Sequence, residues 1–316
     1  MPASGYELDV VVLRGLGEGR RPEPAPAATS CSASGIRTPG AYAGGVQPVP
    51  RWESPWDGHI VLAYDSEAAR RAGVVAWMGR GLQLGAKMLY VEHPDEPRER
   101  SLDAVLSEAR GEFALAVETG QVQVLDLPEQ TLDPAWLTTV LAEALGAGYP
   151  SVRLSGKASA AWTVTSPPEH LEIERAADSI CSTAPVSVMC QYSTRVTESA
   201  LEHAWSVHSA GLRESLLQTV PIPTGVAVAG EVDRSNERVL RSVLAAAILR
   251  ELGTFVVDLS RLRFLDLSGV RALVTATEAH RRHGGVVRLL EPRPPVDHLL
   301  RLLGLDRAEG FILEGA

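Results

Sequence analysis

The stretch Thr254–Gly285, TFVVDLSRLRFLDLSGVRALVTATEAHRRHGG, decides the fold of the C-terminal part of the chain. It opens on the apolar run Phe255-Val256-Val257, which is typical of a buried strand, and a second apolar pair follows at Phe264-Leu265. After the loop Asp266-Leu267-Ser268-Gly269, four residues recur at i, i+3, i+4 and i+7, namely Val270, Leu273, Val274 and Thr277. That spacing lies on one face of a helix, so the stretch predicts a strand, a loop and a helix.

The flanking segments extend this pattern. Val226–Asp233 alternates as a strand does and ends in Gly-Glu-Val-Asp, and residues 239–248 carry a helical stripe. Downstream, Val286–Leu290 predicts another strand and residues 296–303 a last short helix. This order of elements over residues 218–316 predicts a small α/β domain, with a mixed sheet and helices packed on it.

The strand, the Asp-Leu-Ser-Gly loop and the Gly-Glu-Val-Asp turn resemble the signatures of STAS domains, the anti-sigma factor antagonist family. The resemblance implies a protein partner, either an anti-sigma factor of the GHKL-type serine kinase class or another protein of a STAS pathway. It also implies where that partner binds, around Asp233, Asp266, Leu267, Ser268 and Gly269.

The loop departs from the family at one position. In antagonist STAS proteins the partner kinase phosphorylates a serine at the helix start, and the added charge breaks the complex. The residue after Asp266 is Leu267, which has no hydroxyl, so Ser268 is the candidate phosphoacceptor. Asp266 and Ser268 both offer a side-chain oxygen to the unpaired amides of the helix start. Because serine is strongly preferred as a helix cap, we expect Ser268 to be an N-cap and not a phosphoacceptor. The phosphorylation switch is then missing or displaced.

Between His59 and Leu217, strand-like and helical segments alternate, which predicts a second α/β domain with a mostly parallel sheet. Four of its segments resemble the MEDS sensory domain: His59-x4-Tyr64-Asp65, Gly85–Val91, Gly120-Gln121-Val122 and Cys190-Gln191-Tyr192. The resemblance covers residues 57–213. It implies a RecA-like fold without its nucleotide machinery, and a role in sensing.

The nucleotide machinery can be tested against the sequence. A P-loop needs Gly-x4-Gly-Lys-[Ser/Thr], so that backbone amides wrap the phosphates. The segment after the first strand, Tyr64–Arg70, has no glycine and two acids, and Gly156-Lys157 stands where the MEDS family tends to carry Gly-Glu. Both features oppose ATP hydrolysis, so we expect a protein that works by binding and not as an enzyme.

Ligands of α/β folds bind at the C-terminal edge of the sheet. We therefore place a candidate ligand pocket there, formed by His59, Tyr64, Asp65, Lys157 and Gln191. The tryptophans of this region are expected to fill core or partly exposed packing sites, and each of them would also suit the wall of a pocket for a small hydrophobic ligand: Trp77, Trp136, Trp162 and Trp205. Cys190 ends an apolar strand, and we interpret it as an inert buried thiol, not as a nucleophile served by His203 or His208.

Composition argues against several classes of partner and cellular location. The net charge of −9 argues against a nucleic-acid partner, which would require clustered Lys and Arg. The three cysteines are scattered, without metal-ligand spacing, so we expect a cytoplasmic location, no disulfides, no metal and no cofactor. No apolar run is long enough to span a membrane. Residues 1–56 include a stretch rich in Pro, Ala, Gly and Ser and are predicted to be a disordered tail.

Three functional hypotheses follow. The leading one is a bacterial signal-transduction regulator in which the MEDS-like domain senses a ligand or partner and the STAS domain binds an anti-sigma factor, releasing a sigma factor for transcription. A second is a scaffold subunit of a stressosome-like STAS assembly, which would form homo-oligomers. A third is an enzyme that acts on a nucleotide or small molecule with its larger α/β domain.

Overall fold

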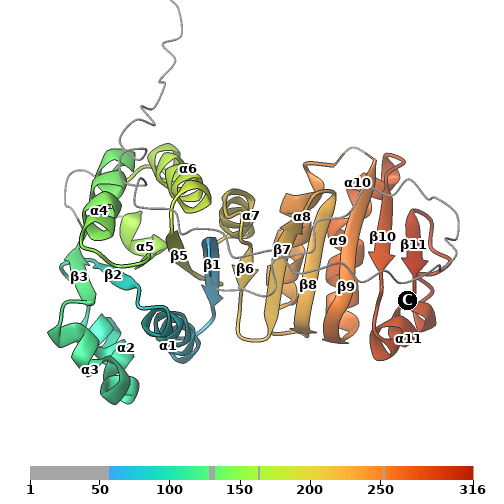
Figure 1. Cartoon of the computed structure of the whole chain (residues 1–316). Coiled ribbons are helices and arrows are strands. Elements are labelled where there is room, and N and C mark those ends of the chain that lie inside the picture. The colour runs from blue at the N-terminus through green and yellow to red at the C-terminus, as the bar shows by residue number, and fades with distance from the viewer. Residues whose placement is uncertain (1–56, 128–131, 163, 252, 316) are drawn as a thin grey trace, which may run out of the picture. The chain divides into compact units, whose positions relative to one another are not determined.

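A sheet of eleven strands runs through the part of the chain that the structure, a computed structural model, describes: residues 57–127, 132–162, 164–251 and 253–315. The strand order is β11-β10-β9-β8-β7-β6-β1-β5-β4-β2-β3 (Figure 1). The predicted disordered tail, residues 1–56, lies outside the described residues.

The N-terminal part of this sheet is entirely parallel. Its strands are β1 (His59–Tyr64), β2 (Lys87–Glu92), β3 (Val122–Asp126), β4 (Val152–Lys157), β5 (Val186–Ser193) and β6 (Leu212–Arg213). The helices that alternate with them are α1 (Glu67–Gln83), α2 (Leu102–Leu106), α3 (Arg110–Glu118), α4 (Pro134–Gly146), α5 (Ala158–Ala161), α6 (Pro167–Thr183) and α7 (Glu198–Val207). The predicted α/β domain with a parallel sheet is confirmed.

Helices cover both faces of these parallel strands (Figure 1). Helices α1, α2 and α3 pack on one face through an apolar cluster that includes Ile60, Trp77 and Phe113. Helices α4 and α6 pack on the other face through a cluster that includes Leu89, Leu141 and Val188. Strands buried on both faces read as continuous apolar runs, which is why β1 and β2 stand out in the sequence.

The C-terminal part of the sheet is mixed, as predicted. Strand β7 (Leu217–Ile222) is antiparallel to both β6 and β8 (Gly225–Val232), whereas β9 (Thr254–Leu265), β10 (Val286–Leu290) and β11 (Phe311–Glu314) continue in parallel from β8. Helices α8 (Glu237–Ile248), α9 (Leu267–Ala276), α10 (Glu278–Arg282) and α11 (Pro294–Leu302) complete this part. Its core joins Val228 and Phe255 of the sheet to Leu244, Leu273 and Leu300 of the helices.

Strand β9 is one strand of 12 residues, although its sequence shows two separate apolar segments. Its register against β8 shifts twice, between Ala227 and Ala229 and again between Gly230 and Glu231. Each shift places an additional residue in β9, so that Leu259, Leu262 and Leu265 are the buried positions. The bulges thus convert an alternating strand into one with an inward side chain at every third residue.

None of the helices in the described ranges is both long enough and apolar enough to cross a membrane.

Candidate functional site

The start of α9 is capped by Asp266. The Asp266 side chain accepts a hydrogen bond from the Gly269 amide, with 2.9 Å between Oδ1 and N. Ser268 is the second residue of the helix, and no hydrogen bond of its hydroxyl is found among the described residues. The prediction that Ser268 caps the helix is therefore wrong. Aspartate is as good a cap as serine, and it lies at the position whose side chain reaches the third amide.

The same turn presents two large apolar side chains to solvent. Leu267 is 57% exposed and Phe264, at the end of β9, is 49% exposed. Gly269 lies against the sheet, because a Cβ there would meet Leu265 Cδ1 at 2.4 Å and Val232 Cγ1 at 2.7 Å. The glycine therefore lets the helix start pack tightly on the sheet, while Leu267 points outward.

A polar hollow lies beside this turn. It is lined by Ser268 and by the guanidinium-bearing side chains of Arg234, Arg241 and Arg271, with Glu237, Ala272 and Thr275. Arg241 also pairs with Glu198 of α7. Ser268 is thus half-buried among cations, a setting that would stabilise a phosphate ester on its hydroxyl.

Asp233 lies at the turn after β8. Its Oδ1 accepts hydrogen bonds from the Ser235 amide at 2.7 Å and from the Ser235 hydroxyl at 2.5 Å. These bonds to Ser235 lower the pKa of Asp233. Asp233 therefore shapes the loop that carries Arg234 into the hollow.

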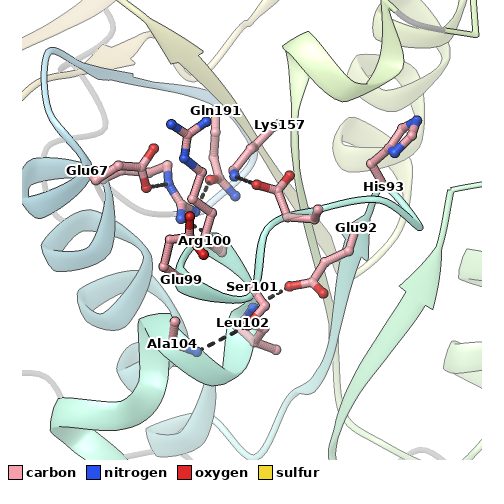
Figure 2. Close-up of polar contacts among 12 residues, drawn as sticks. Glu67, Glu92, His93, Glu99, Arg100, Ser101, Leu102, Ala104, Lys157 and Gln191 are labelled. Atoms are coloured by element: carbon pink, nitrogen blue, oxygen red, sulfur yellow. Dashed lines mark hydrogen bonds and ion pairs between the residues drawn. The ribbon is translucent and has the colours of Figure 1, made fainter.

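A second polar site occupies the C-terminal edge of the parallel strands, after β1 (Figure 2). Arg70 of α1 is fully buried there. Its Nε donates to Glu67 at 2.8 Å, its Nη1 to Tyr90 at 2.8 Å and to Gln191 at 3.1 Å, and its Nη2 to the Arg100 carbonyl at 3.0 Å. Burial raises the pKa of Glu67, but the hydrogen bond and charge of Arg70 outweigh it, so this pKa lies below its ordinary value.

Lys157 and Gln191 come to this edge as predicted. The Lys157 ammonium donates to Glu96 at 2.7 Å, and the Gln191 amide donates to Ser155 at 2.9 Å. Burial lowers the pKa of Lys157, and Glu96 offsets part of that effect. Figure 2 shows Glu67, Lys157 and Gln191 gathered together, whereas His93 points away from them.

Of the other residues predicted for the pocket, only some lie at this edge. Tyr64 is buried at the end of β1 and Asp65 is exposed beyond it, both at this edge. His59 is at the opposite end of β1, and it shares a sheet face with Cys190, not with Gln191. The placement of His59 in this pocket is therefore wrong, because five residues of strand span about 16 Å.

Arg70 is a residue that the sequence analysis missed, although a signal was present. Arg70, Val74 and Trp77 fall at i, i+4 and i+7 of α1, so the arginine stands on the buried stripe of its helix. A cation at such a position needs buried partners. Its guanidinium group and the Ser66 cap, which accepts from the Ala69 amide at 3.3 Å, lie where a P-loop protein would bind phosphates.

An apolar cavity of about 80 Å³ lies under α4, α5 and α6. Its lining is mostly aliphatic, with Trp136 as the aromatic member and Lys157, His170, Glu174 and Cys190 as the polar ones. A cavity of this size and character accepts a ligand of a few non-hydrogen atoms. Trp136 lines this cavity, whereas Trp77 is buried in the core, which is the packing role expected of these tryptophans.

Comparison with known proteins agrees with this organisation. The family model described as MEDS, the methanogen/methylotroph DcmR sensory domain, matches residues 58–209, and the STAS domain model described as Mlab matches residues 215–314. No curated protein matches the chain.

Several solved structures are similar to parts of the chain. The anti-sigma factor antagonist SpoIIAA in its unphosphorylated form is 24% identical and has a TM-score of 0.27, with 31% of this chain and 86% of that chain covered. An anti-sigma factor antagonist from Mycobacterium paratuberculosis is 22% identical with a TM-score of 0.27, over 30% of this chain and 83% of that one. The flagellar accessory protein FlaH from Methanocaldococcus jannaschii is 12% identical with a TM-score of 0.36, over 53% and 78% respectively.

A parallel α/β domain without a P-loop, joined to a mixed-sheet domain with a capped and exposed helix start, defines a modular α/β protein. The chain is a fusion of a MEDS domain, over residues 58–209, with a C-terminal STAS domain, over residues 215–314.

Proposed function

We propose that this protein is an anti-sigma factor antagonist that acts by binding, and that its MEDS domain senses a small apolar ligand. The observation that carries the proposal is the α9 start, where Leu267 and Phe264 stay 57% and 49% exposed on either side of the capping Asp266. Large apolar side chains that are exposed next to a polar rim are typical of the centre of a protein interface.

The partner that this surface fits is an anti-sigma factor of the GHKL kinase class. Such a kinase must approach a hydroxyl, and Ser268 supplies one next to Leu267. Arg234, Arg241 and Arg271 then surround the position that a phosphate on Ser268 would occupy. Phosphorylation would redirect these cations inward and change the docking surface, so Ser268 is our proposed phosphoacceptor. Asp233 and Asp266 shape the loops, and Gly269 permits their close packing. We place this exchange in the cytoplasm.

The MEDS domain supplies binding in this proposal and not catalysis. At the edge where a P-loop protein would bind phosphates, Arg70 is committed to Glu67, Tyr90 and Gln191, and Lys157 is paired with Glu96. The apolar cavity of about 80 Å³ is the proposed sensing site, and Lys157 forms part of its wall.

A capture experiment with matched variants tests the docking surface. Full-length protein would be used as bait in native lysate, as wild type, as Leu267→Asp and as Leu302→Asp. Leu302 is 71% exposed on α11 and serves as the control. We expect wild type and Leu302→Asp to recover a GHKL-type kinase, and Leu267→Asp to lose at least tenfold of it, because an interfacial charge without a partner costs several kcal/mol.

Mass spectrometry of the same material would locate any phosphate, which we expect on Ser268. Equal recovery of the kinase by all three baits would place docking elsewhere. Recovery of other STAS proteins in large assemblies, without a kinase, would favour the scaffold function instead.

A further inference from the structure

Four side chains with metal-ligating atoms meet inside the MEDS domain: His59 of β1, Glu174 of α6, Cys190 of β5 and His208 after α7. One donor atom from each lies within 4.8 Å of the donors from the other three. His59, Glu174 and His208 are all at least 98% buried, with exposed fractions of 0%, 2% and 1%.

The fold explains why these residues meet. Strands β1 and β5 are neighbours in parallel register, with Val61 opposite Cys190, so His59 and Cys190 point to the same face of the sheet. Helix α6 covers that face and brings Glu174 over the two strands. The chain then returns after α7, where His208 stacks on His59 with ring centroids 3.8 Å apart. Four distant segments therefore supply one donor each.

The measured separations suit a single bound ion. Glu174 Oε2 is 3.0 Å from His59 Nε2, 3.3 Å from His208 Nε2 and 3.3 Å from Cys190 Sγ, and Cys190 Sγ is 3.6 Å from His59 Nε2. In a tetrahedral zinc site with Zn–N of about 2.0–2.1 Å and Zn–S of about 2.3 Å, neighbouring donors are about 3.3–3.6 Å apart. Three of these four separations match such edges, the one between Glu174 and His59 is shorter, and the two remaining donor pairs lie within 4.8 Å.

The outward nitrogens of both histidines face acceptors. His208 Nδ1 lies 2.5 Å from the Ala204 carbonyl, which can only accept, so this nitrogen bears the proton and Nε2 bears a lone pair. His59 Nδ1 lies 3.4 Å from Asp178 Oδ1, close enough for an ion pair but without a hydrogen bond. Carboxylates and carbonyls behind histidine ligands hold the ring in the tautomer that a metal requires.

This tautomer leaves a conflict that a cation would remove. His208 Nε2 has no hydrogen-bond partner among the described residues, yet it faces Glu174 Oε2 at 3.3 Å. A lone pair opposite a carboxylate oxygen in a buried setting is repulsive, and a buried polar atom without a partner costs about 1–3 kcal/mol. A metal ion between the two atoms would coordinate both.

We propose that His59, Glu174, Cys190 and His208 bind one divalent transition-metal ion of the zinc class. Two imidazoles, a carboxylate and a thiolate form a mixed N, O and S set, which suits zinc and not calcium or magnesium. The carboxylate and the thiolate neutralise the ion, so the buried centre carries no net charge. Since Cys190 must lose its proton, binding releases a proton and strengthens as the pH rises.

The centre borders the apolar cavity of about 80 Å³, because Glu174 and Cys190 line both. The remaining bonds of Glu174 hold it in place: Oε1 accepts from the Tyr192 hydroxyl at 2.9 Å and lies 3.0 Å from His170 Nε2. A small molecule in the cavity would therefore lie beside the ion.

Metal titration of the tag-free, full-length protein tests the proposal. We expect about one equivalent of zinc per chain by elemental mass spectrometry, and with Co²⁺ the visible and near-ultraviolet bands of a tetrahedral, thiolate-ligated ion. Cys190→Ser should lose the thiolate-to-cobalt band. Cys181→Ser, which alters the other cysteine that the structure describes as free, should keep it.

A residue that orients one of the ligating histidine rings offers a second variant, which leaves the donor set intact. Asp178→Asn retains all four donors and should weaken zinc affinity about 10- to 100-fold in competition with a chelator of known affinity. This variant decides the question if Cys190→Ser does not fold. Folded wild type that binds neither Zn²⁺ nor Co²⁺, a thiolate band that persists in Cys190→Ser, or unchanged zinc affinity in Asp178→Asn would overturn the proposal.

Discussion

The helix starts of α1 and α9 have the same local design and opposite surroundings. Each follows a parallel strand, and each is capped by a short side chain, Ser66 or Asp266, that accepts from the third amide of the helix. The first residue of α1, Glu67, bonds to the buried Arg70, whereas the first residue of α9, Leu267, is 57% exposed. The α1 start is covered by the protein's own side chains, and we call it the closed start. The α9 start keeps a large apolar side chain exposed, and we call it the open start.

The largest loss of stability is expected when the buried cation at the start of α1 is removed. Arg70→Leu should destabilise the protein by about 3 kcal/mol, because Tyr90, Gln191 and the Arg100 carbonyl lose a charged donor, and a hydrogen bond to a charged group contributes about 1.5–3 kcal/mol. Urea unfolding would measure the loss, with the exposed Arg98→Leu as control. A change below about 0.5 kcal/mol would mean that Arg70 does not close this site.

A smaller effect distinguishes the two side chains at the open start. Asp266→Ala should lower the free energy of unfolding by about 1 kcal/mol through loss of the cap. Ser268→Ala should change it by less than about 0.5 kcal/mol, since its hydroxyl has no hydrogen bond among the described residues. Thermal and urea unfolding of both variants would show the difference. A larger loss of stability in Ser268→Ala than in Asp266→Ala would identify Ser268 as the cap.

The smallest expected effect is a pH dependence of the free energy of unfolding that arises at the start of α1. The pKa of Glu67 is lower in the folded protein than its ordinary value, so its contribution is present above the unfolded pKa and disappears as the pH falls through the folded pKa. Glu67→Gln should therefore cost less than about 1 kcal/mol at pH 7, since the carboxylate is partly exposed, and nothing once the pH lies below the folded pKa of Glu67. Unfolding curves across this range would check it, and a cost independent of pH would exclude the ion pair as its source.

Much of the fold follows from the sequence, because its strands and helices carry strong periodicity. Val286–Leu290 is β10 without change of bounds, and the helical stripe predicted over residues 239–248 lies within α8. Strand β7, with Pro221 within it, and the short β6 were missed, because neither has an apolar run that separates it from a loop.

The candidate sites were less predictable than the fold. The docking loop follows from one continuous motif, so its residues could be named, but the choice of cap between two good capping residues depends on backbone geometry. The cluster around Glu174 could not be read from spacing. Its members come from four segments and meet only because β1 and β5 are neighbours and α6 crosses them.

The two bulges of β9 have a consequence for how the chain tolerates changes in length. Between Leu259 and Leu265 the core requires only that three leucines point inward, and each pair is separated by two outward residues instead of one. Loss of Arg263 would remove a bulge and restore simple alternation without turning Leu262 or Leu265 away from the core. The core therefore determines which residues of this strand are buried but not how many lie between them, so relatives that differ here by a single insertion or deletion can share the same interior.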